Sequence, residues 1–410
     1  MNTLKFITAG NVDDGKSTLI GRLLYDSNSI HTDQLGVLEK RKSNDSDEID
    51  LSLITDGLRA EREQGITIDV AYKYFSTSKR KFIIADAPGH EQYTRNMITG
   101  ASNSELIIIL IDARKGITSQ TKRHASIGSL MGIKKAIVAV NKIDLVDYSE
   151  DVFHAIKTDF EALKDQLNYD EIVFVPVSAL VGDNIVDKSP RTPWYKGENL
   201  LHLLETISID TNKDLPARFQ VQWVIRPKDE QHHDYRGYAG QVLSGTYKVG
   251  DSIKVFPSNI ESKIIKIERH LEEVDHAVEG ENIVIHLENN IDISRGDTIV
   301  KISEEPVATN EPKAWICWLD NQSLQPGKTY ELQHRFHSVR TKVREIDQQW
   351  DINNWNFIPT DEVKLNDIAQ VTLKTNQPLF YDLFEKNNKT GNAILIDETT
   401  KNTVAAVMFI

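Results

Sequence analysis

The first half of the chain alternates continuous apolar runs with helix-like stretches. The runs fall at residues 6–7, 82–85, 106–111, 136–140 and 172–175, and they contain only Ile, Leu, Val, Phe and Ala. A strand that is buried on both faces of a parallel sheet has this continuous pattern, whereas a half-exposed strand alternates. The repeated order of strand, helix and strand predicts a doubly wound, mostly parallel α/β domain over residues 1–212.

After about residue 212 the apolar positions follow a period of two. Asn212–Pro216 reads as a linker, and residues 219–224 beyond it alternate apolar and polar side chains. Turn signals recur at 244–245, 250–251 and 296–297, a second break falls at 303–306, and alternation returns at 341–346. This pattern of alternating strands and turns predicts two all-β domains, each a barrel or a sandwich, over residues 213–303 and 304–410.

Composition excludes several classes of protein. The formal net charge of −13 argues against nucleic-acid binding through bulk charge, so we expect no nucleic-acid partner. No run of about 18 apolar residues appears, so we expect no membrane span, and the N-terminus lacks the features of a signal peptide. The single cysteine, Cys317, fits a reducing compartment, and we expect a cytoplasmic location.

A phosphate-binding loop follows the first predicted strand and opens a helix-like stretch. The loop fits the pattern G-x-x-x-x-G-K-[ST], and the predicted nucleotide contacts are Gly10, Asn11, Val12, Asp13, Asp14, Gly15, Lys16, Ser17 and Thr18. The glycines let backbone amides and the helix N-terminus face the phosphates. We expect Lys16 to contact the β- and γ-phosphates and Ser17 to bind Mg²⁺.

A second loop follows the run at 82–85. It comprises Asp86, Ala87, Pro88, Gly89 and His90. A carboxylate at the end of a strand can hold Mg²⁺ through water, the Gly89 amide can reach the γ-phosphate, and His90 stands where a side chain could orient the attacking water. The alternative interpretation is a simple Pro-Gly turn with a loop histidine.

A third loop follows the run at 136–140 and would read the base. It comprises Asn141, Lys142, Ile143 and Asp144, and a supporting loop follows at Ser178, Ala179 and Leu180. Guanine offers two adjacent N–H donors that the Asp144 carboxylate can accept, whereas adenine does not. The sequence therefore predicts GTP and Mg²⁺ as ligands. All the loops come at the carboxyl ends of predicted strands, where doubly wound sheets bind ligands.

With these loops in order, the chain resembles translation-factor GTPases of the elongation factor Tu type. The matching segments are residues 10–17, 65–68, 86–90 and 141–144. The resemblance implies a GTPase domain followed by two β-barrels, with Thr67 as a further ligand of Mg²⁺. It also implies that Lys16, Thr67, Gly89 and His90 take part in catalysis, and that Val12 and Ile66 form an apolar gate in front of His90.

Within that superfamily the chain is similar to the GTPase subunits of bacterial sulfate adenylyltransferase. Asn11 and Asp14 in the phosphate loop carry this resemblance, together with residues 53–69, 90–97, 193–197, 234–240 and 293–297. It implies that GTP hydrolysis drives formation of adenylyl sulfate and pyrophosphate from ATP and sulfate, the first step of sulfate assimilation. That chemistry would lie on a partner catalytic subunit, in a heterodimer or a higher assembly. The sequence is consistent with this division of labour, because it contains a single phosphate loop and the base-reading loop that accompanies it is suited to guanine.

Two departures from this family qualify the resemblance. The loop at residues 226–234 is longer than usual, and its pair His232 and His233 reads as a solvated loop because adjacent side chains diverge. Some relatives carry a fused adenylylsulfate kinase, but no second phosphate loop occurs here, so we do not expect that activity. Two other functions stay open: a carrier that delivers an RNA ligand to the ribosome, and a regulatory switch without coupled chemistry.

Overall fold

The computed structural model describes residues 3–27, 29, 51, 69–90, 93–209, 215–227, 235–351 and 356–410. Thr67, Ile66, the His232–His233 pair and most of the predicted linker lie outside these residues. The chain divides into two compact units, the first within residues 1–210 and the second within 211–351 and 356–410. No helix of the described part is long and apolar enough to cross a membrane.

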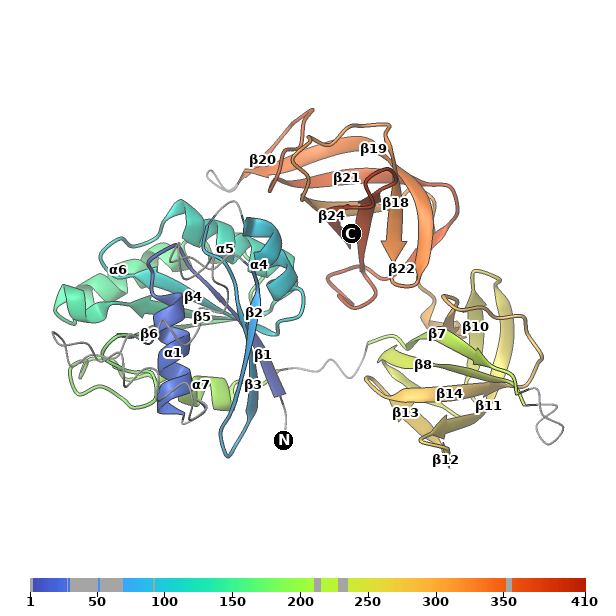
Figure 1. Cartoon of the computed structure of the whole chain (residues 1–410), viewed down its shortest axis with the longest axis horizontal. Coiled ribbons are helices and arrows are strands. Elements are labelled where there is room, and N and C mark those ends of the chain that lie inside the picture. Colours follow the sequence, from blue (N-terminus) through green and yellow to red (C-terminus); the bar gives the residue numbers. More distant parts are fainter. Residues whose placement is uncertain are drawn as a thin grey trace. The chain divides into compact units, whose positions relative to one another are not determined.

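The first unit is built on a six-stranded sheet (Figure 1). Its strands, in spatial order, are β2 (Ala71–Ser76), β3 (Lys81–Asp86), β1 (Thr3–Ala9), β4 (Leu106–Asp112), β5 (Lys135–Asn141) and β6 (Glu171–Pro176). Each of the five predicted apolar runs lies in a strand of this sheet, and these five strands are parallel. The predicted mostly parallel α/β domain is therefore confirmed.

Helices cover both faces of the sheet, and this explains the continuous apolar runs. The helices are α1 (Lys16–Asp26), α4 (Thr94–Ala101), α5 (Ser119–Leu130), α6 (Glu150–Glu161) and α7 (Leu200–Thr206), with 3₁₀ turns η3 (Ile143–Val146) and η4 (Lys164–Gln166). In β4, Ile108 packs in one cluster with residues of α1 and α7, whereas Ile107 faces Gly128 of α5. All seven residues of β4 are buried, as expected for a central strand with two covered faces.

The edge strand β2 was not predicted. It pairs antiparallel with β3, and its exposed residues include Tyr72 and Tyr74. It has no continuous apolar run, and exposed residues alternate along it with more buried ones, because one of its faces is solvated.

The second unit contains two closed antiparallel barrels of six strands each, which confirms the predicted pair of all-β barrels. The strands of the first are β7 (Arg218–Ile225), β8 (Gly237–Ser244), β10 (Ser252–Phe256), β11 (Ile260–Arg269), β14 (Asn282–Leu287) and β15 (Thr298–Lys301), with the short β9 (Thr246–Lys248), β12 (Glu272–Val274) and β13 (His276–Val278) beside them. Those of the second are β17 (Lys313–Trp318), β18 (Thr329–His334), β19 (His337–Asp351), β21 (Ile368–Thr375), β23 (Asn392–Asp397) and β24 (Thr403–Phe409), with β16 (Val307–Thr309), β20 (Asn356–Ile358), β22 (Leu379–Tyr381) and the 3₁₀ turn η5 (Ile302–Glu304). The two barrels have separate apolar cores.

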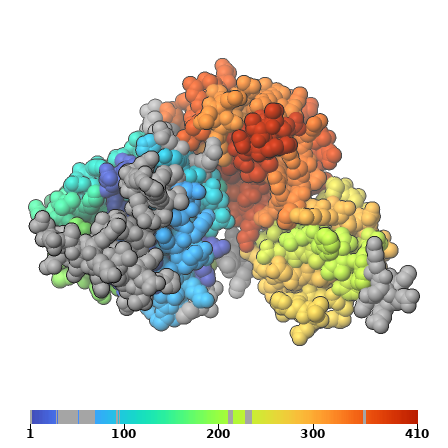
Figure 2. Space-filling view, viewed as in Figure 1, coloured from blue at the N-terminus to red at the C-terminus, as the bar shows by residue number. Residues whose placement is uncertain are grey.

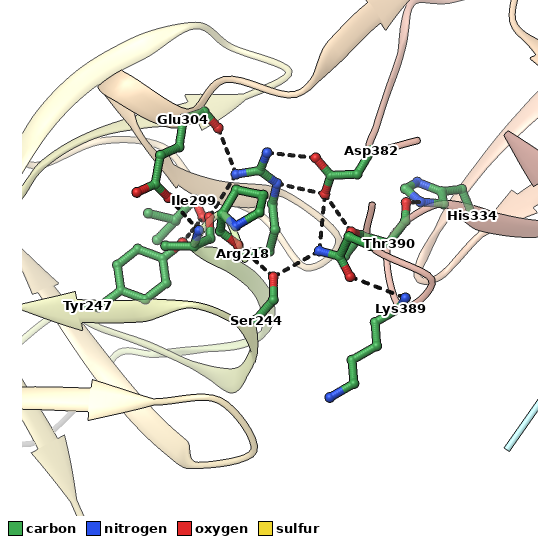
Figure 3. A network of polar contacts seen from close by, with 12 residues as sticks. Arg218, Ser244, Tyr247, Ile299, Glu304, His334, Asp382, Lys389 and Thr390 are labelled. Atoms are coloured by element: carbon green, nitrogen blue, oxygen red, sulfur yellow. Dashed lines mark hydrogen bonds and ion pairs between the residues drawn. The ribbon is translucent and has the colours of Figure 1, made fainter. Parts of the chain in front are cut away.

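The two barrels lie against each other (Figure 2), and a buried ion pair joins them. Arg218 of β7 donates to both carboxylate oxygens of Asp382, with distances of 2.9 Å from Nε and 2.7 Å from Nη2 (Figure 3). Thr390 and Asn387 also donate to this carboxylate, and Asn387 donates to Ser244 of the first barrel at 3.0 Å. Every member of this network is at least nine-tenths buried, so polar contacts and not apolar packing alone hold the barrels together.

Candidate nucleotide site

The predicted phosphate loop connects β1 to α1. Gly15 has a φ of 92°, a left-handed conformation that glycine adopts without strain. A Cβ atom at this position would lie 2.5 Å from Nδ2 of Asn141, so the close approach of another loop also requires glycine. The backbone therefore has the tight turn that a phosphate cradle needs.

Asn11 and Asp14 brace this loop from inside. The backbone N–H of Asn11 donates to Oδ2 of Asp14 at 2.7 Å, and the N–H of Val12 donates to the side-chain oxygen of Asn11 at 2.8 Å. Asp14 is almost fully buried, and burial raises the pKa of its carboxyl group above the ordinary value. The sequence predicted these residues as nucleotide contacts and as marks of a family, and the structure adds a role in shaping the loop.

Lys16 is the first residue of α1, and its side chain lies against the loop. Its ammonium group donates to the backbone oxygens of Gly10 at 2.9 Å and Asn11 at 3.0 Å. Burial lowers the pKa of Lys16, and the nearby carboxylate of Asp86 opposes that shift. The cation is thus held at the centre of the loop by weak neutral acceptors, which a phosphate oxygen can replace.

The second predicted loop, at the end of β3, packs against the first. A Cβ atom on Gly89 would lie 2.5 Å from Nζ of Lys16 and 2.6 Å from the oxygen of Gly10, so only glycine fits there. Asp86 ends the strand, is buried, and accepts a hydrogen bond from Thr8 at 3.4 Å. Ala87 and Pro88 are buried, whereas His90 is exposed and its ring lies 6.0 Å from that of Tyr93.

Asn141 ties the third loop, residues 141–144, to the phosphate loop and to the loop at 178–180. It is 1% exposed, its Nδ2 donates to the backbone oxygen of Asp14 at 2.7 Å, and its Oδ1 accepts from the N–H of Ala179 at 2.9 Å. The N–H of Ile143 donates to the oxygen of Val177 at 3.2 Å. One side chain therefore joins the phosphate loop, the 141–144 loop and the 178–180 loop.

The remaining members of the third and fourth loops surround this junction. Lys142 has a φ of 62°, and its ammonium donates to the backbone oxygen of Asp13. Asp144 is partly exposed, Ser178 is fully buried, and Leu180 is 48% exposed. The structure thus brings together loops separated by more than a hundred residues, as parallel strands that end at one edge of a sheet require.

Two contacts in this region were not predicted from the sequence. Gln120 of α5 donates to the backbone oxygen of Gly89 at 2.9 Å, and Asp112 forms an ion pair with Lys142 at 3.1 Å. Neither residue belongs to a motif, and both act through partners more than twenty residues away. A carboxylate that ends an otherwise apolar strand was the one available signal for Asp112.

The residues fit a nucleotide and Mg²⁺. The phosphate loop is a cradle that a Cβ on Gly15 or Gly89 would fill. Mg²⁺ on a nucleotide usually takes only one or two protein oxygens beside phosphates and water. The half-buried Ser17 and the buried Asp86 suit such a site, and no group of three or more His, Cys, Asp or Glu side chains that could hold a metal occurs among the described residues.

Comparisons with known proteins agree with this geometry. The family model "Elongation factor Tu GTP binding domain" matches residues 1–212, and "GTP-eEF1A C-terminal domain-like" matches residues 311–410. The GTPase-like domain of Saccharomyces cerevisiae Ski7, solved with bound GTP, shares the fold, with a TM-score of 0.53 at 19% identity over 100% of this chain and 97% of that one.

Comparison with individual curated proteins assigns the chain to a smaller group within this family. A sulfate adenylyltransferase subunit 1 from Aeromonas hydrophila is 47% identical, over 99% of this chain and 86% of its own length. Another of that name from Bacteroides thetaiotaomicron is 46% identical with the same coverage of both chains. The chain therefore belongs to the family of elongation factor Tu-type GTP-binding proteins and, within it, to the sulfate adenylyltransferase subunit 1 family.

Proposed function

We propose that this chain is a GTPase subunit whose GTP hydrolysis drives the adenylylation of sulfate on a partner subunit. The observation that carries the proposal is the identity of 47% over 99% of the chain to relatives named for that enzyme. The joined phosphate and base loops support the GTPase part independently of that name.

The phosphates would lie on the loop from Gly10 to Ser17. There Lys16 would exchange its two backbone acceptors for β- and γ-phosphate oxygens, and Gly89 would donate its amide to the γ-phosphate. Bound Mg²⁺ would neutralise charge between these phosphates, with Ser17, Thr67 and, through water, Asp86 as its contacts. Thr67 enters this set by resemblance, since it lies outside the described residues.

The base would lie on the side where Asn141 joins the loops. Asp144 is partly exposed and can accept hydrogen bonds from N1–H and the 2-amino group of guanine. Ala179 and Leu180 would support the base from the neighbouring loop. The proposed selectivity for GTP over ATP rests on this carboxylate, because a site built for a polar group rejects a ligand that lacks it.

His90 would orient the water that attacks the γ-phosphorus. Its side chain is exposed and follows Gly89 directly, so it can turn toward a phosphate held by the Gly89 amide. Water attacks, the bond to the β-phosphate oxygen breaks, and GDP and inorganic phosphate are released. The phosphate-loop pattern occurs once in the sequence, at residues 10–17, and ATP and sulfate would react on the partner to give adenylyl sulfate and pyrophosphate.

The test is GTP turnover by this chain co-expressed with its partner subunit, followed together with pyrophosphate release. We expect ATP plus sulfate to stimulate GTP hydrolysis, and GTP to raise pyrophosphate formation. Lys16→Ala serves as the control, because it should abolish both effects while the partner stays present. Stimulation by ribosomes instead of ATP plus sulfate would establish a carrier, and stimulation by neither would leave a regulatory switch.

A further inference from the structure

Asp112 is a buried carboxylate next to the base-reading loop. It is the last residue of β4, its side chain has no exposed area, and it lies in register with Asn141, the last residue of β5. Six apolar residues precede it in the strand. A charge in this position is costly unless other groups pair with it.

Two cations pair with this carboxylate. Arg114 donates to both oxygens, at 3.0 Å from Nε and 2.7 Å from Nη2, and its backbone N–H donates a third hydrogen bond at 3.0 Å. The ammonium of Lys142 lies 3.1 Å from Oδ2. Burial alone would raise the pKa of Asp112, but the hydrogen bonds from Arg114 and Lys142 outweigh it and hold that pKa well below its ordinary value.

Lys142 links Asp112 to the phosphate loop. The same ammonium group donates to the backbone oxygen of Asp13, so it is shared between the end of β4 and the phosphate loop. Its backbone has a φ of 62°, a conformation that a non-glycine residue keeps only when its surroundings fix it. Arg114, the other cation paired with Asp112, also interacts electrostatically with Asp144.

We propose that Asp112 is a positioning residue of the nucleotide site: together with Arg114 it fixes the Lys142 ammonium against the phosphate loop and so slows the release of guanine nucleotide. The inference rests on the proposed binding of GTP at these loops. Lys142 has three rotatable donors on a flexible stem, so without a fixed anion its ammonium would lose its single position. The base loop and the phosphate loop would then separate more readily.

The test measures dissociation of a fluorescent GDP analogue from the full chain, chased with unlabelled GDP in a stopped-flow instrument. Asp112→Asn keeps the shape but removes the charge, and we expect dissociation to become about tenfold faster, as for loss of one charge-assisted hydrogen bond. In a Lys142→Met background, Asp112→Asn should not accelerate dissociation further, because the ammonium group that Asp112 positions is already absent. Arg114→Met, at a half-exposed position, should accelerate release by a smaller factor and only where Lys142 is present.

Asp159→Asn is the matched control, since Asp159 is an exposed carboxylate of α6 in the same unit, and it should leave the rate within about twofold. Equal acceleration by Asp112→Asn with and without Lys142 would overturn the proposal and make Asp112 a purely structural residue. An unchanged rate would overturn it too. If Asp112→Asn does not fold, the Arg114→Met pair of measurements decides. Failure of the proposed GTP binding looks different, because then the unsubstituted chain would not bind the GDP analogue.

Discussion

Arg218→Met removes the cation from the buried pair that joins the two barrels. Methionine can replace most of the apolar stem of arginine, so the change isolates the charge and its hydrogen bonds. Asp382 would remain with its carboxylate buried, since only 9% of its side chain is exposed. The variant therefore tests whether this ion pair is needed for the stability of the second unit.

The expected loss in the free energy of unfolding depends on which hydrogen bonds remain around Asp382 in the variant. Breaking a buried pair by removing one member typically costs about 3–5 kcal/mol. Thr390 and Asn387 still donate to Asp382 in the variant, which favours the lower end of this range of free energies. The backbone oxygens of Ala217 and Glu304 lose their donor at the same time, which raises the loss. We expect a loss of about 4 kcal/mol, which lowers the melting temperature of a unit of this size by about 8–16 °C.

Differential scanning calorimetry of the full chain measures this effect. Added GDP should raise the transition of the first unit, so the transition that does not respond belongs to the barrels. The double variant Arg218→Met with Asp382→Leu should be more stable than the single variant, because it removes the unpaired charge.

A surface pair in the same unit provides the control. Arg344 and Glu311 lie 2.8 Å apart, but their side chains are 55% and 45% exposed, so Arg344→Met should cost less than about 1 kcal/mol. The reasoning is refuted if Arg218→Met lowers the melting temperature no more than Arg344→Met does.

Three further predictions concern the nucleotide site and the pH dependence of the barrels. Asp144→Asn should weaken GTP binding about 100-fold, as loss of charge-assisted hydrogen bonds implies, and shift preference toward xanthosine triphosphate in competition binding; unchanged preference would refute the base-reading role. His90→Ala should slow single-turnover GTP hydrolysis at least about 100-fold while sparing GTP affinity, and an unaltered rate would make His90 a loop residue. Burial lowers the pKa of His334 from 6.5 to about 4, so its contribution to stability is present above about pH 6.5 and is lost as the pH falls toward 4. Urea unfolding of the second unit should lose up to about 3 kcal/mol across that range, and His334→Gln should flatten the dependence.

The sequence predicted five of the six strands of the sheet and the positions of the loops that follow them, because these signals are local. Each apolar run became a strand, and each loop lies at the carboxyl end of its strand, as for Asp86 and Asn141. The domain bounds at 212 and 303, and the roles of Thr67 and His90, stay predictions.

Long-range polar pairing could not be predicted. Arg218 and Asp382 are 164 residues apart, and no periodicity links an arginine at the start of one barrel to a carboxylate late in the next. The bracing of Lys142 by Asp112 depends on the register between β4 and β5, which an apolar pattern does not specify. Charged residues inside a fold are recognised only when their partners are known.

The double attachment of Asn141 limits how this site could be re-engineered. Its amide is shared by Asp14 and Ala179, so the loop that grips phosphate and the loop that supports the base depend on one side chain. A chimera that imported a base-reading loop from a protein of different nucleotide preference would have to import both neighbouring loops with it. A single side chain such as Asp144 can alter which base is read, but a whole base-reading loop would keep its position only if its contacts to these two neighbouring loops were kept as well.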